Sequence, residues 1–324
     1  MRRSSQSVSP ANGAYDTNPR PRAGGFVQNR AFSKINLILD VLNRRHDGYH
    51  SVQSVMQTLS LHDVITIKTA VDSENSFRLT CSDASLPTDD RNLVTKAAKF
   101  MISEYGITQS IHIHLEKNIP TAAGLGGGSS DCAATLIGLN NLFDLQIPLH
   151  TKEQFISCFI EEQLSLTKIG QRFGADVPFC LIGGTVLAEG IGEILTPLPC
   201  HPQCYVLLAC PDIPVSTKEI FTKYTPPTTR QTNIPAMIQA INSGDLNQIA
   251  NNFSNDLTGI TARIHPKINI LINEMKNQGA LNAAMSGSGP SVYGYFTDKD
   301  IVEKAQKELA KIAKMAFITN IMGR

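Results

Sequence analysis

The chain has 324 residues, of which 42% are hydrophobic and 18% are charged, and its 29 basic and 28 acidic side chains nearly cancel. One hydrophobic core rarely organises a chain of this length, so we expect two domains. The charge balance argues against a nucleic-acid-binding surface, and the lack of any run of about 18 apolar residues argues against a membrane span.

The cysteine pattern indicates a reducing compartment. Seven cysteines occur without a Cys-x-x-Cys pair, which favours free thiols and a cytoplasmic protein. Cys200, His201 and Cys204 lie close in sequence, but three such residues in a proline-rich turn make a poor zinc site. We expect a loop there.

The first 25 residues are rich in Ser, Pro, Gly, Asn and Arg and contain few apolar side chains, so we expect a disordered tail. An Arg- and Ser-rich, acid-poor start is also found in organelle transit sequences. Because no amphipathic helix is evident, we expect a plain extension instead.

The segment 34–41 alternates apolar and polar residues, which predicts a strand. Its two faces carry Ile35, Leu37, Leu39 and Val41 on one side and Lys34 and Asn36 on the other. The polar pair is compatible with solvated edge residues or with a functional site. Asp47 and Gly48 then predict a turn, and 64–67 and 77–80 predict further strands. Beyond them, Asp89 and Asp90 are candidate caps for a helix with Leu93, Ala97, Phe100 and Met101 on its inner face.

A glycine-rich segment at 124–130, Gly-Leu-Gly-Gly-Gly-Ser-Ser, lies between a predicted strand at 111–116 and a predicted helix that continues to Phe143. Ser129 or Ser130 is a natural N-cap for this helix. Glycines let backbone N–H groups converge, and a helix start adds partial positive charge, so the segment suits a polyphosphate. A tight turn before a buried helix is the alternative, but it would explain only one or two of the glycines.

Two better-known phosphate motifs do not match this segment. A Walker A loop ends in Gly-Lys-Ser/Thr, whereas Gly128 is followed by two serines and no lysine. The dinucleotide fingerprint needs a third glycine at position 129, which is a serine.

Asp176 lies among apolar residues just before Pro178. It suits two roles equally well. It could cap a helix that has the proline in its first turn, or act as a partly desolvated acid or base.

The rest of the chain mixes strands and helices without strict alternation, which predicts an α+β fold. Strands are expected at 185–188, 205–209 and 291–296. Helices are expected around 155–160, 216–222, 234–252 and 266–277 and over a segment carrying Val302, Ala305, Leu309 and Ile312. A proline-rich segment at 197–202 is the candidate linker, and 285–290 form a second glycine-rich turn.

Three stretches together resemble the signatures of the GHMP (galactokinase, homoserine, mevalonate, phosphomevalonate) small-molecule kinases. They are Lys-Ile-Asn-Leu at 34–37, Pro120 with the loop at 124–130, and Ser-Gly-Ser-Gly at 286–289. Further features are similar to the branch of this family that acts on 4-diphosphocytidyl-2-C-methyl-D-erythritol. These features lie at 47–50, 126–131, 174–178, 190–193 and 214–221.

The resemblance runs from about Ala31 onward and implies two domains. The first, over 26–195, would resemble the second domain of ribosomal protein S5 and bind ATP, and the second, over 196–324, would be ferredoxin-like. The implied activity is ATP-dependent phosphorylation of the 2-hydroxyl of 4-diphosphocytidyl-2-C-methyl-D-erythritol, a step in the methylerythritol phosphate route to isoprenoids. The implied partner is thus a small molecule, with no nucleic acid and no membrane, for a monomer or homodimer.

The resemblance also assigns roles to residues. Asp176 would accept the hydroxyl proton, and Lys34 beside it would stabilise charge on the transferring phosphoryl group. ATP would contact Asn92, Lys117, Pro120, Gly124, Leu125, Gly126, Gly127, Gly128, Ser129 and Ser130. The cytidyl substrate would contact Asn36, Tyr49, His50, Thr217 and Phe221. Mg²⁺ would bridge the β- and γ-phosphates, with Ser130 as its candidate protein ligand.

Two alternatives remain at this point. Another kinase of the same superfamily, for homoserine or a mevalonate-type substrate, would share the glycine-rich loop but would not be expected to carry Asp-Gly-Tyr-His at 47–50. A non-catalytic nucleotide- or RNA-binding module is the other, and the presence of Lys34 and Asp176 weighs against it.

Overall fold

The structure is a computed structural model that describes residues 24–70, 76–149, 165–225 and 233–323. The helix expected around 155–160 and nearly all of the expected tail lie outside these ranges. None of the helices in the described ranges is long and apolar enough to cross a bilayer.

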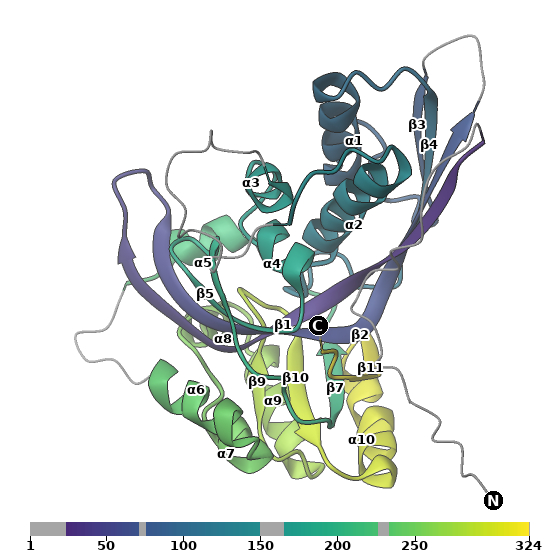
Figure 1. Ribbon diagram of the computed structural model, residues 1–324. Coiled ribbons are helices and arrows are strands. Elements are labelled where there is room, and N and C mark those ends of the chain that lie inside the picture. The colour runs from purple at the N-terminus through teal and green to yellow at the C-terminus, as the bar shows by residue number, and fades with distance from the viewer. Residues whose placement is uncertain (1–23, 71–75, 150–164, 226–232, 324) are drawn as a thin grey trace, which may run out of the picture.

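Two long antiparallel strands run across the molecule (Figure 1). They are β1 (Phe26–Arg44) and β2 (His50–Ala70), joined by a turn in which Gly48 has φ +87°. The strand predicted at 34–41 is thus confirmed but is only part of β1. Register shifts after Phe32, Asn36 and Val41 break the alternation, so the strand buries aliphatic side chains at consecutive positions around Ile38.

Strand β2 is the centre of the N-terminal sheet and pairs directly with three other strands. The order is β3-β4-β2-β1-β8, and β5 pairs with another part of β2 and also with β6. The added strands are β3 (Phe77–Cys81), β4 (Ser110–Glu116), β5 (Thr185–Glu189), β6 (Ile194–Pro197) and β8 (Ser254–Asn255). The strands predicted at 64–67, 77–80, 111–116 and 185–188 are therefore confirmed.

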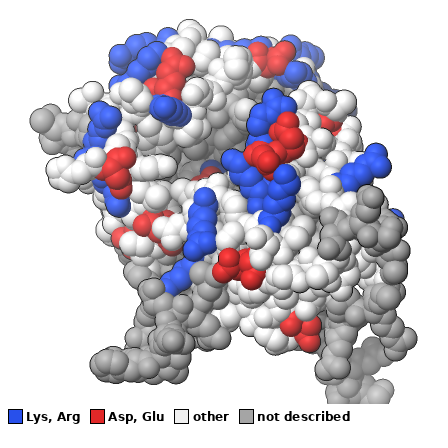
Figure 2. All heavy atoms as spheres, turned by 90° about the horizontal axis from the view of Figure 1, so that it is seen from above, with Lys and Arg blue, Asp and Glu red and all other residues white. Residues whose placement is uncertain are grey.

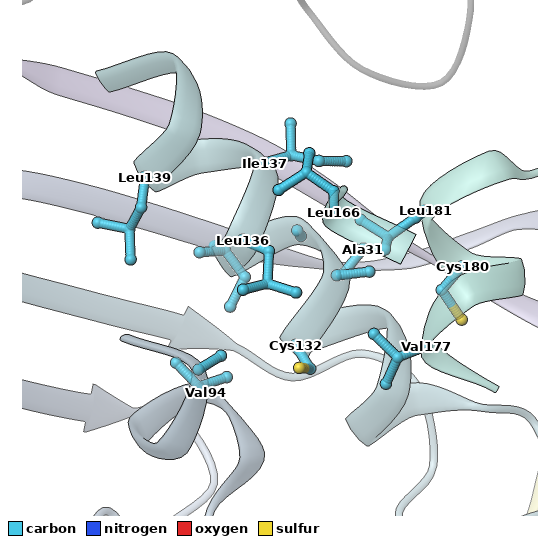
Figure 3. Packing of buried hydrophobic residues seen from close by; sticks show 14 of the residues in the cluster. Ala31, Val94, Cys132, Leu136, Ile137, Leu139, Leu166, Val177, Cys180 and Leu181 are labelled. Carbon is cyan, nitrogen blue, oxygen red and sulfur yellow. The ribbon is translucent and has the colours of Figure 1, made fainter. Parts of the chain in front are cut away.

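Four helices cover one face of this sheet (Figure 1). They are α1 (Leu93–Glu104), α2 (Gly127–Leu142), α3 (Leu166–Gln171) and α4 (Val177–Ile182). Helix α2 is the centre of this layer and buries most of its residues. Figure 3 shows Leu136 and Ile137 of α2 in the same apolar cluster as Val94 of α1 and Leu181 of α4. The body of α2 is consequently held by packing on several sides.

The C-terminal half builds a second sheet in the order β11-β7-β10-β9. Its strands are β7 (Tyr205–Cys210), β9 (Ala283–Met285), β10 (Val292–Phe296) and β11 (Met315–Asn320). One face packs on α9 (Lys267–Asn277) and α10 (Lys299–Ile312), and the other packs on apolar residues of β1 and β2. The remaining helices are α5 (Thr217–Lys223), α6 (Ile234–Ser243), α7 (Leu246–Asn251) and α8 (Thr258–Ile264).

The two sheets are also joined by hydrogen bonds at the middle of β2. Leu59 forms a β-bridge with Ile321, and Thr319 accepts a hydrogen bond from the Leu61 amide at 2.9 Å. Gln57 is fully buried and donates to the Met322 carbonyl at 2.8 Å. The C-terminal strand therefore fixes one sheet against the other.

Several local predictions need correction. The helix predicted over 234–252 is two helices, because Gly244 has φ +67° and Asp245 caps a new helix. Asn92 rather than Asp89 or Asp90 caps α1, since its side chain accepts from the Val94 amide. Strand β11 and helix α8 were not expected from the sequence.

The mixture of two sheets with helices on their outer faces confirms the predicted α+β class. The expected boundary between 195 and 196 falls inside β6, which pairs only with the N-terminal sheet among the described strands. We therefore propose that the boundary lies in the segment 198–204, just before β7.

His201 supports a test of the second core. Its ring lies edge-on to Tyr295, its Nδ1 donates to the Pro202 carbonyl at 2.6 Å, and its Nε2 accepts from the Tyr295 hydroxyl at 3.2 Å. This arrangement needs the neutral imidazole. Burial lowers the pKa of His201 to about 4 from the ordinary value of 6.5.

We predict that this burial makes the protein less stable in acid. Above pH 6.5 both folded and unfolded states hold the neutral ring, but between pH 6.5 and 4 only the unfolded state gains a proton. The free energy of unfolding should therefore fall by at most about 3 kcal/mol across this window. Urea unfolding at several pH values would measure it, and His201→Phe should lose this part of the slope. An unchanged slope in the variant would contradict the prediction.

Candidate active site

The glycine-rich loop enters helix α2 through two left-handed residues. Gly124 has φ +75° and Gly126 has φ +73°, and Gly126 occupies the cap position with no side chain capping the helix. The prediction that Ser129 or Ser130 caps the helix is therefore wrong, because the helix begins a turn earlier, at Gly127. A helix start without a side-chain cap leaves its first N–H groups for a ligand, as a phosphate site requires.

Lys34 lies directly under this loop. Its amide donates to the Leu125 carbonyl at 2.9 Å, and a Cβ at Gly126 would lie only 2.8 Å from its Cγ. The side chain is 5% exposed, which excludes the solvated-edge interpretation. The ammonium donates to Asn36 Oδ1 at 2.8 Å and lies 3.5 Å from Asp176 Oδ2.

Asp176 occupies the position before α4, with Pro178 in the first turn as expected. Its side chain, however, makes no capping hydrogen bond to that helix. It turns instead toward Lys34, and 38% of it is exposed. The sequence pattern left two roles open for Asp176, and this geometry excludes the role of a side-chain cap.

The second glycine-rich turn completes the floor of the site. Ser286 Oγ donates to the Gly124 carbonyl at 2.9 Å. A Cβ at Gly124 would lie 2.4 Å from the Ser286 carbonyl oxygen, and one at Gly287 would lie 3.5 Å from the Lys34 ammonium. The N-terminal and C-terminal loops thus meet backbone to backbone beside Lys34.

Asn36 is held by a chain of buried hydrogen bonds. Its amide nitrogen donates to Ser54 Oγ at 2.8 Å, and that hydroxyl donates to the Ile38 carbonyl at 2.7 Å. Because its nitrogen is used there, its oxygen is directed to Lys34. The sequence pattern gave no indication of Ser54, or of Asn255, which donates to the Gly287 carbonyl at 2.8 Å.

Three of the residues expected to contact the cytidyl substrate lie together at α5: Thr217 and Phe221 belong to this helix, and His50 contacts Phe221. Thr217 Oγ1 hydrogen-bonds to Ser288 Oγ at 2.8 Å. The rings of His50 and Phe221 lie 5.4 Å apart, and burial, followed by the nearby Arg44 charge, lowers the pKa of His50. Tyr49 is 61% exposed, and its amide donates to Asp47 in the turn.

The residues expected to contact ATP differ in how exposed they are and in whether their polar atoms are already hydrogen-bonded. Asn92 uses both polar atoms of its side chain, because it caps α1 and donates to the Pro87 carbonyl. Pro120 is partly buried in the segment between β4 and the loop. Ser130 is fully buried and donates to the Gly127 carbonyl at 2.9 Å, so its hydroxyl is not free for a metal in this arrangement. Ser129 is the partly exposed serine, and its Oγ lies 3.8 Å from the position of a Cβ at Gly174.

Lys117 is turned inward, with 7% of its side chain exposed. It pairs with two buried carboxylates, Asp63 and Asp131. Burial works to lower the pKa of Lys117, but attraction to Asp131 and Asp63 outweighs it and raises the pKa. Burial raises the pKa of Asp131, attraction to Lys117 opposes this, and repulsion from Asp63 adds to the rise.

A depression of about 810 Å³ opens elsewhere, between β3 and α1, with walls that include Phe77, Cys81, Thr88 and Lys99. None of the residues expected at the active site lines it. We therefore place the site by its chemistry, at the glycine-rich loop. Figure 2 shows that basic and acidic side chains are interspersed over the face seen from above.

Comparison with known proteins decides the family. The models for the N-terminal and C-terminal domains of GHMP kinases match residues 92–184 and 237–314. A relative from Lachnoclostridium phytofermentans, named 4-diphosphocytidyl-2-C-methyl-D-erythritol kinase, is 41% identical over 297 residues, which cover 91% of this chain and 97% of the relative. The chain belongs to the GHMP kinase family.

Solved structures agree with the fold of this kinase. A crystal structure of 4-(cytidine 5'-diphospho)-2C-methyl-D-erythritol kinase superposes with a TM-score of 0.75 at 28% identity, covering 92% of this chain and all of the other. A homoserine kinase from Cytophaga hutchinsonii reaches 0.66 at 19% identity, covering 90% and 94% of the two chains. The second likeness shows the shared fold alone.

We predict that Gly124→Ala damages the kinase through its backbone. A left-handed alanine costs about 1–2 kcal/mol, and its Cβ would also meet a carbonyl oxygen of the second loop. Melting temperature and kcat should both fall. Gly259→Ala is the control, since it lies in helix α8 with nothing within 4 Å of the new Cβ. Equal behaviour of the two variants would show that the loops can separate freely.

Proposed function

We propose that the protein transfers the γ-phosphoryl group of ATP to the 2-hydroxyl of 4-diphosphocytidyl-2-C-methyl-D-erythritol. The observation that carries this proposal is the identity of 41%, over almost the full length of both chains, with a relative named for that substrate. The Lys34–Asp176 pair beside the glycine-rich loop supports the chemistry.

Asp176 is proposed as the base. Its carboxylate is partly exposed, so a substrate hydroxyl can approach it, while Lys34 holds it from the buried side. The hydroxyl oxygen would form a bond to the γ-phosphorus as the bond to the β–γ bridging oxygen breaks and ADP leaves. The hydroxyl proton would pass to Asp176 and then to solvent.

The second requirement is to stabilise the negative charge on the phosphoryl group as it is transferred. Phosphoryl transfer goes through a loose transition state, so catalysis depends on positioning and on stabilising the equatorial oxygens. Lys34 would supply a fixed positive charge, since Asn36 holds its ammonium in place. The backbone N–H groups at the start of α2, near Gly126 and Gly127, would hold the ATP phosphates.

The residues present fit a Mg²⁺ ion that arrives with ATP. Magnesium in kinases is bound mainly by phosphate oxygens and waters, with one or two protein oxygens. No cluster of three or more His, Cys, Asp or Glu side chains that could hold a metal occurs in the described ranges. Asp176 and Ser129 both carry partly exposed oxygens near the loop, and as the metal ligand we propose Ser129 rather than the buried Ser130. The ion would neutralise phosphate charge.

The cytidyl group is proposed to bind near α5. His50 and Phe221 already lie together there, and Thr217 links this helix to the second glycine-rich turn. An aromatic ring can stack on a pyrimidine, whereas a polar edge can read its identity. Tyr49 is exposed beside His50 and is available as a further wall.

The RNA-binding alternative has less support. On the face shown in Figure 2, charges of both signs are interspersed rather than gathered into a basic stripe. An acid–lysine pair beneath a phosphate loop has no use in simple RNA binding. A homoserine- or mevalonate-type substrate remains the alternative within the family.

A substrate panel tests the proposed function. ADP formation should be fast with 4-diphosphocytidyl-2-C-methyl-D-erythritol and slow with homoserine, mevalonate or galactose, and it should require Mg²⁺. The coupled assay should report kcat/KM for each alcohol at fixed ATP. A higher kcat/KM with any of the other alcohols would overturn the assignment.

Replacing the catalytic pair tests the mechanism. We predict that Asp176→Asn and Lys34→Met each lower kcat by about 100-fold or more, because a general base and a transition-state charge act mainly while the bond is breaking. The KM for ATP should change much less. Thermal unfolding would confirm that both variants fold. A nearly normal kcat in Asp176→Asn would show that this residue is not the base and only occupies the cap position before α4.

A further inference from the structure

The glycine-rich loop is anchored by three buried side chains, those of Asp63, Lys117 and Asp131, which contact one another and are turned away from solvent. We propose that Asp63, Lys117 and Asp131 are positioning residues that hold the loop and the start of α2 in the geometry that binds ATP. This inference rests on the proposed function, because it assumes that ATP binds at this loop.

Asp63 fixes where the chain leaves β4. It is fully buried in β2, and its Oδ1 accepts the amides of Asn118 at 2.5 Å and Ile119 at 2.7 Å. These are the last residues before Pro120 and the loop. Two backbone donors on one carboxylate oxygen determine the direction of the chain there, so the entry to the loop is fixed to the sheet.

Lys117 carries this constraint to the helix. Its ammonium contacts Asp63 Oδ2 and also donates to Asp131 Oδ2 at 2.8 Å, in the second turn of α2. The exposed fractions of the Lys117, Asp63 and Asp131 side chains are 7%, 0% and 4%. Because these side chains are closed off from water, the hydrogen bond from Lys117 to Asp131 resists movement of α2 against β2 and β4.

Gly127, the first residue of α2, packs on the same ammonium. A Cβ there would lie 3.3 Å from Lys117 Nζ and 3.2 Å from Ile119 Cγ2. The lysine therefore supports the first helical turn directly. If it shifted, the N–H groups proposed to hold phosphate would shift with it.

The three groups have unequal roles. The Asp63 carboxylate accepts hydrogen bonds from two backbone amides and from Lys117. The Asp131 carboxylate accepts one from Lys117 through Oδ2, and Asp131 Oδ1 has no hydrogen-bond partner among the described residues. Removing Lys117 would leave two unpaired buried carboxylates, and such a variant could fail to fold. Changing Asp131 instead leaves the balanced Asp63–Lys117 pair and cuts only the link to α2.

The test uses two substitutions at this position. Asp131→Asn keeps an oxygen that accepts from Lys117, and Asp131→Leu fills a similar space without an acceptor. Asp212→Leu is the matched control, since it breaks an exposed pair with Lys314 of the same 2.8 Å length. Binding of a non-hydrolysable ATP analogue with Mg²⁺ is measured by titration calorimetry, and thermal unfolding confirms that each variant is folded.

We expect Asp131→Leu to raise the dissociation constant for the analogue about tenfold, because small displacements of positioned groups are costly. Asp131→Asn and the control should stay within about twofold of the parent, on the same reasoning. In turnover assays, the KM for ATP should rise in Asp131→Leu while the KM for the alcohol does not. If Asp131 had a merely structural role, Asp131→Leu would lower the melting temperature without raising the KM for ATP selectively over the KM for the alcohol.

Three results would count against the inference. Parent-like binding by Asp131→Leu would show that the link does not position the loop. Equal weakening in Asp131→Asn would show that the negative charge matters and not the contact. A parent protein that bound no analogue would overturn the proposed function, and the inference with it.

Discussion

Everything at this site depends on one close approach between two backbones. At Gly124 the phosphate loop meets the Ser286–Gly289 turn so tightly that a Cβ would lie 2.4 Å from a carbonyl oxygen. The contact joins a loop of the first sheet to a loop of the second. It also brings Gly287 beside the Lys34 ammonium, while Ser288 of the same turn is hydrogen-bonded to Thr217 of α5.

Much of this arrangement could be predicted from local pattern. The strand at 111–116, the glycine-rich loop and the helix after it were recognisable because periodicity and glycine content are local properties. The exact residue at which the helix begins could not be predicted. A serine before a helix resembles a cap, yet here a left-handed Gly126 begins the helix and leaves its N–H groups uncapped. The rule failed at the helix start where we propose that ATP phosphates bind.

Contacts between distant residues could not be read from the sequence. Lys34 follows a segment expected to be disordered and resembles an edge residue, and only family resemblance connected it with Asp176. The pairing of Lys117 with Asp63 and Asp131 was not indicated by the sequence, because charges that pair across 54 positions have no period. Strand β11 was missed for a similar reason, since its register is set by β7 and by the middle of β2.

The joint between β2 and the C-terminal strand has a consequence for the order in which the protein is made. Gln57 reaches the Met322 carbonyl across 265 positions of the chain. Closing so long a loop costs entropy that only the finished contact repays, and a chain emerging from the ribosome cannot make it until residues near 320 appear. Strand β2, which pairs with the strand of Lys34, is therefore among the earliest segments synthesised and among the last to be completed, and a nascent chain would hold the glycine-rich loop before the Ser286–Gly289 turn exists to meet it.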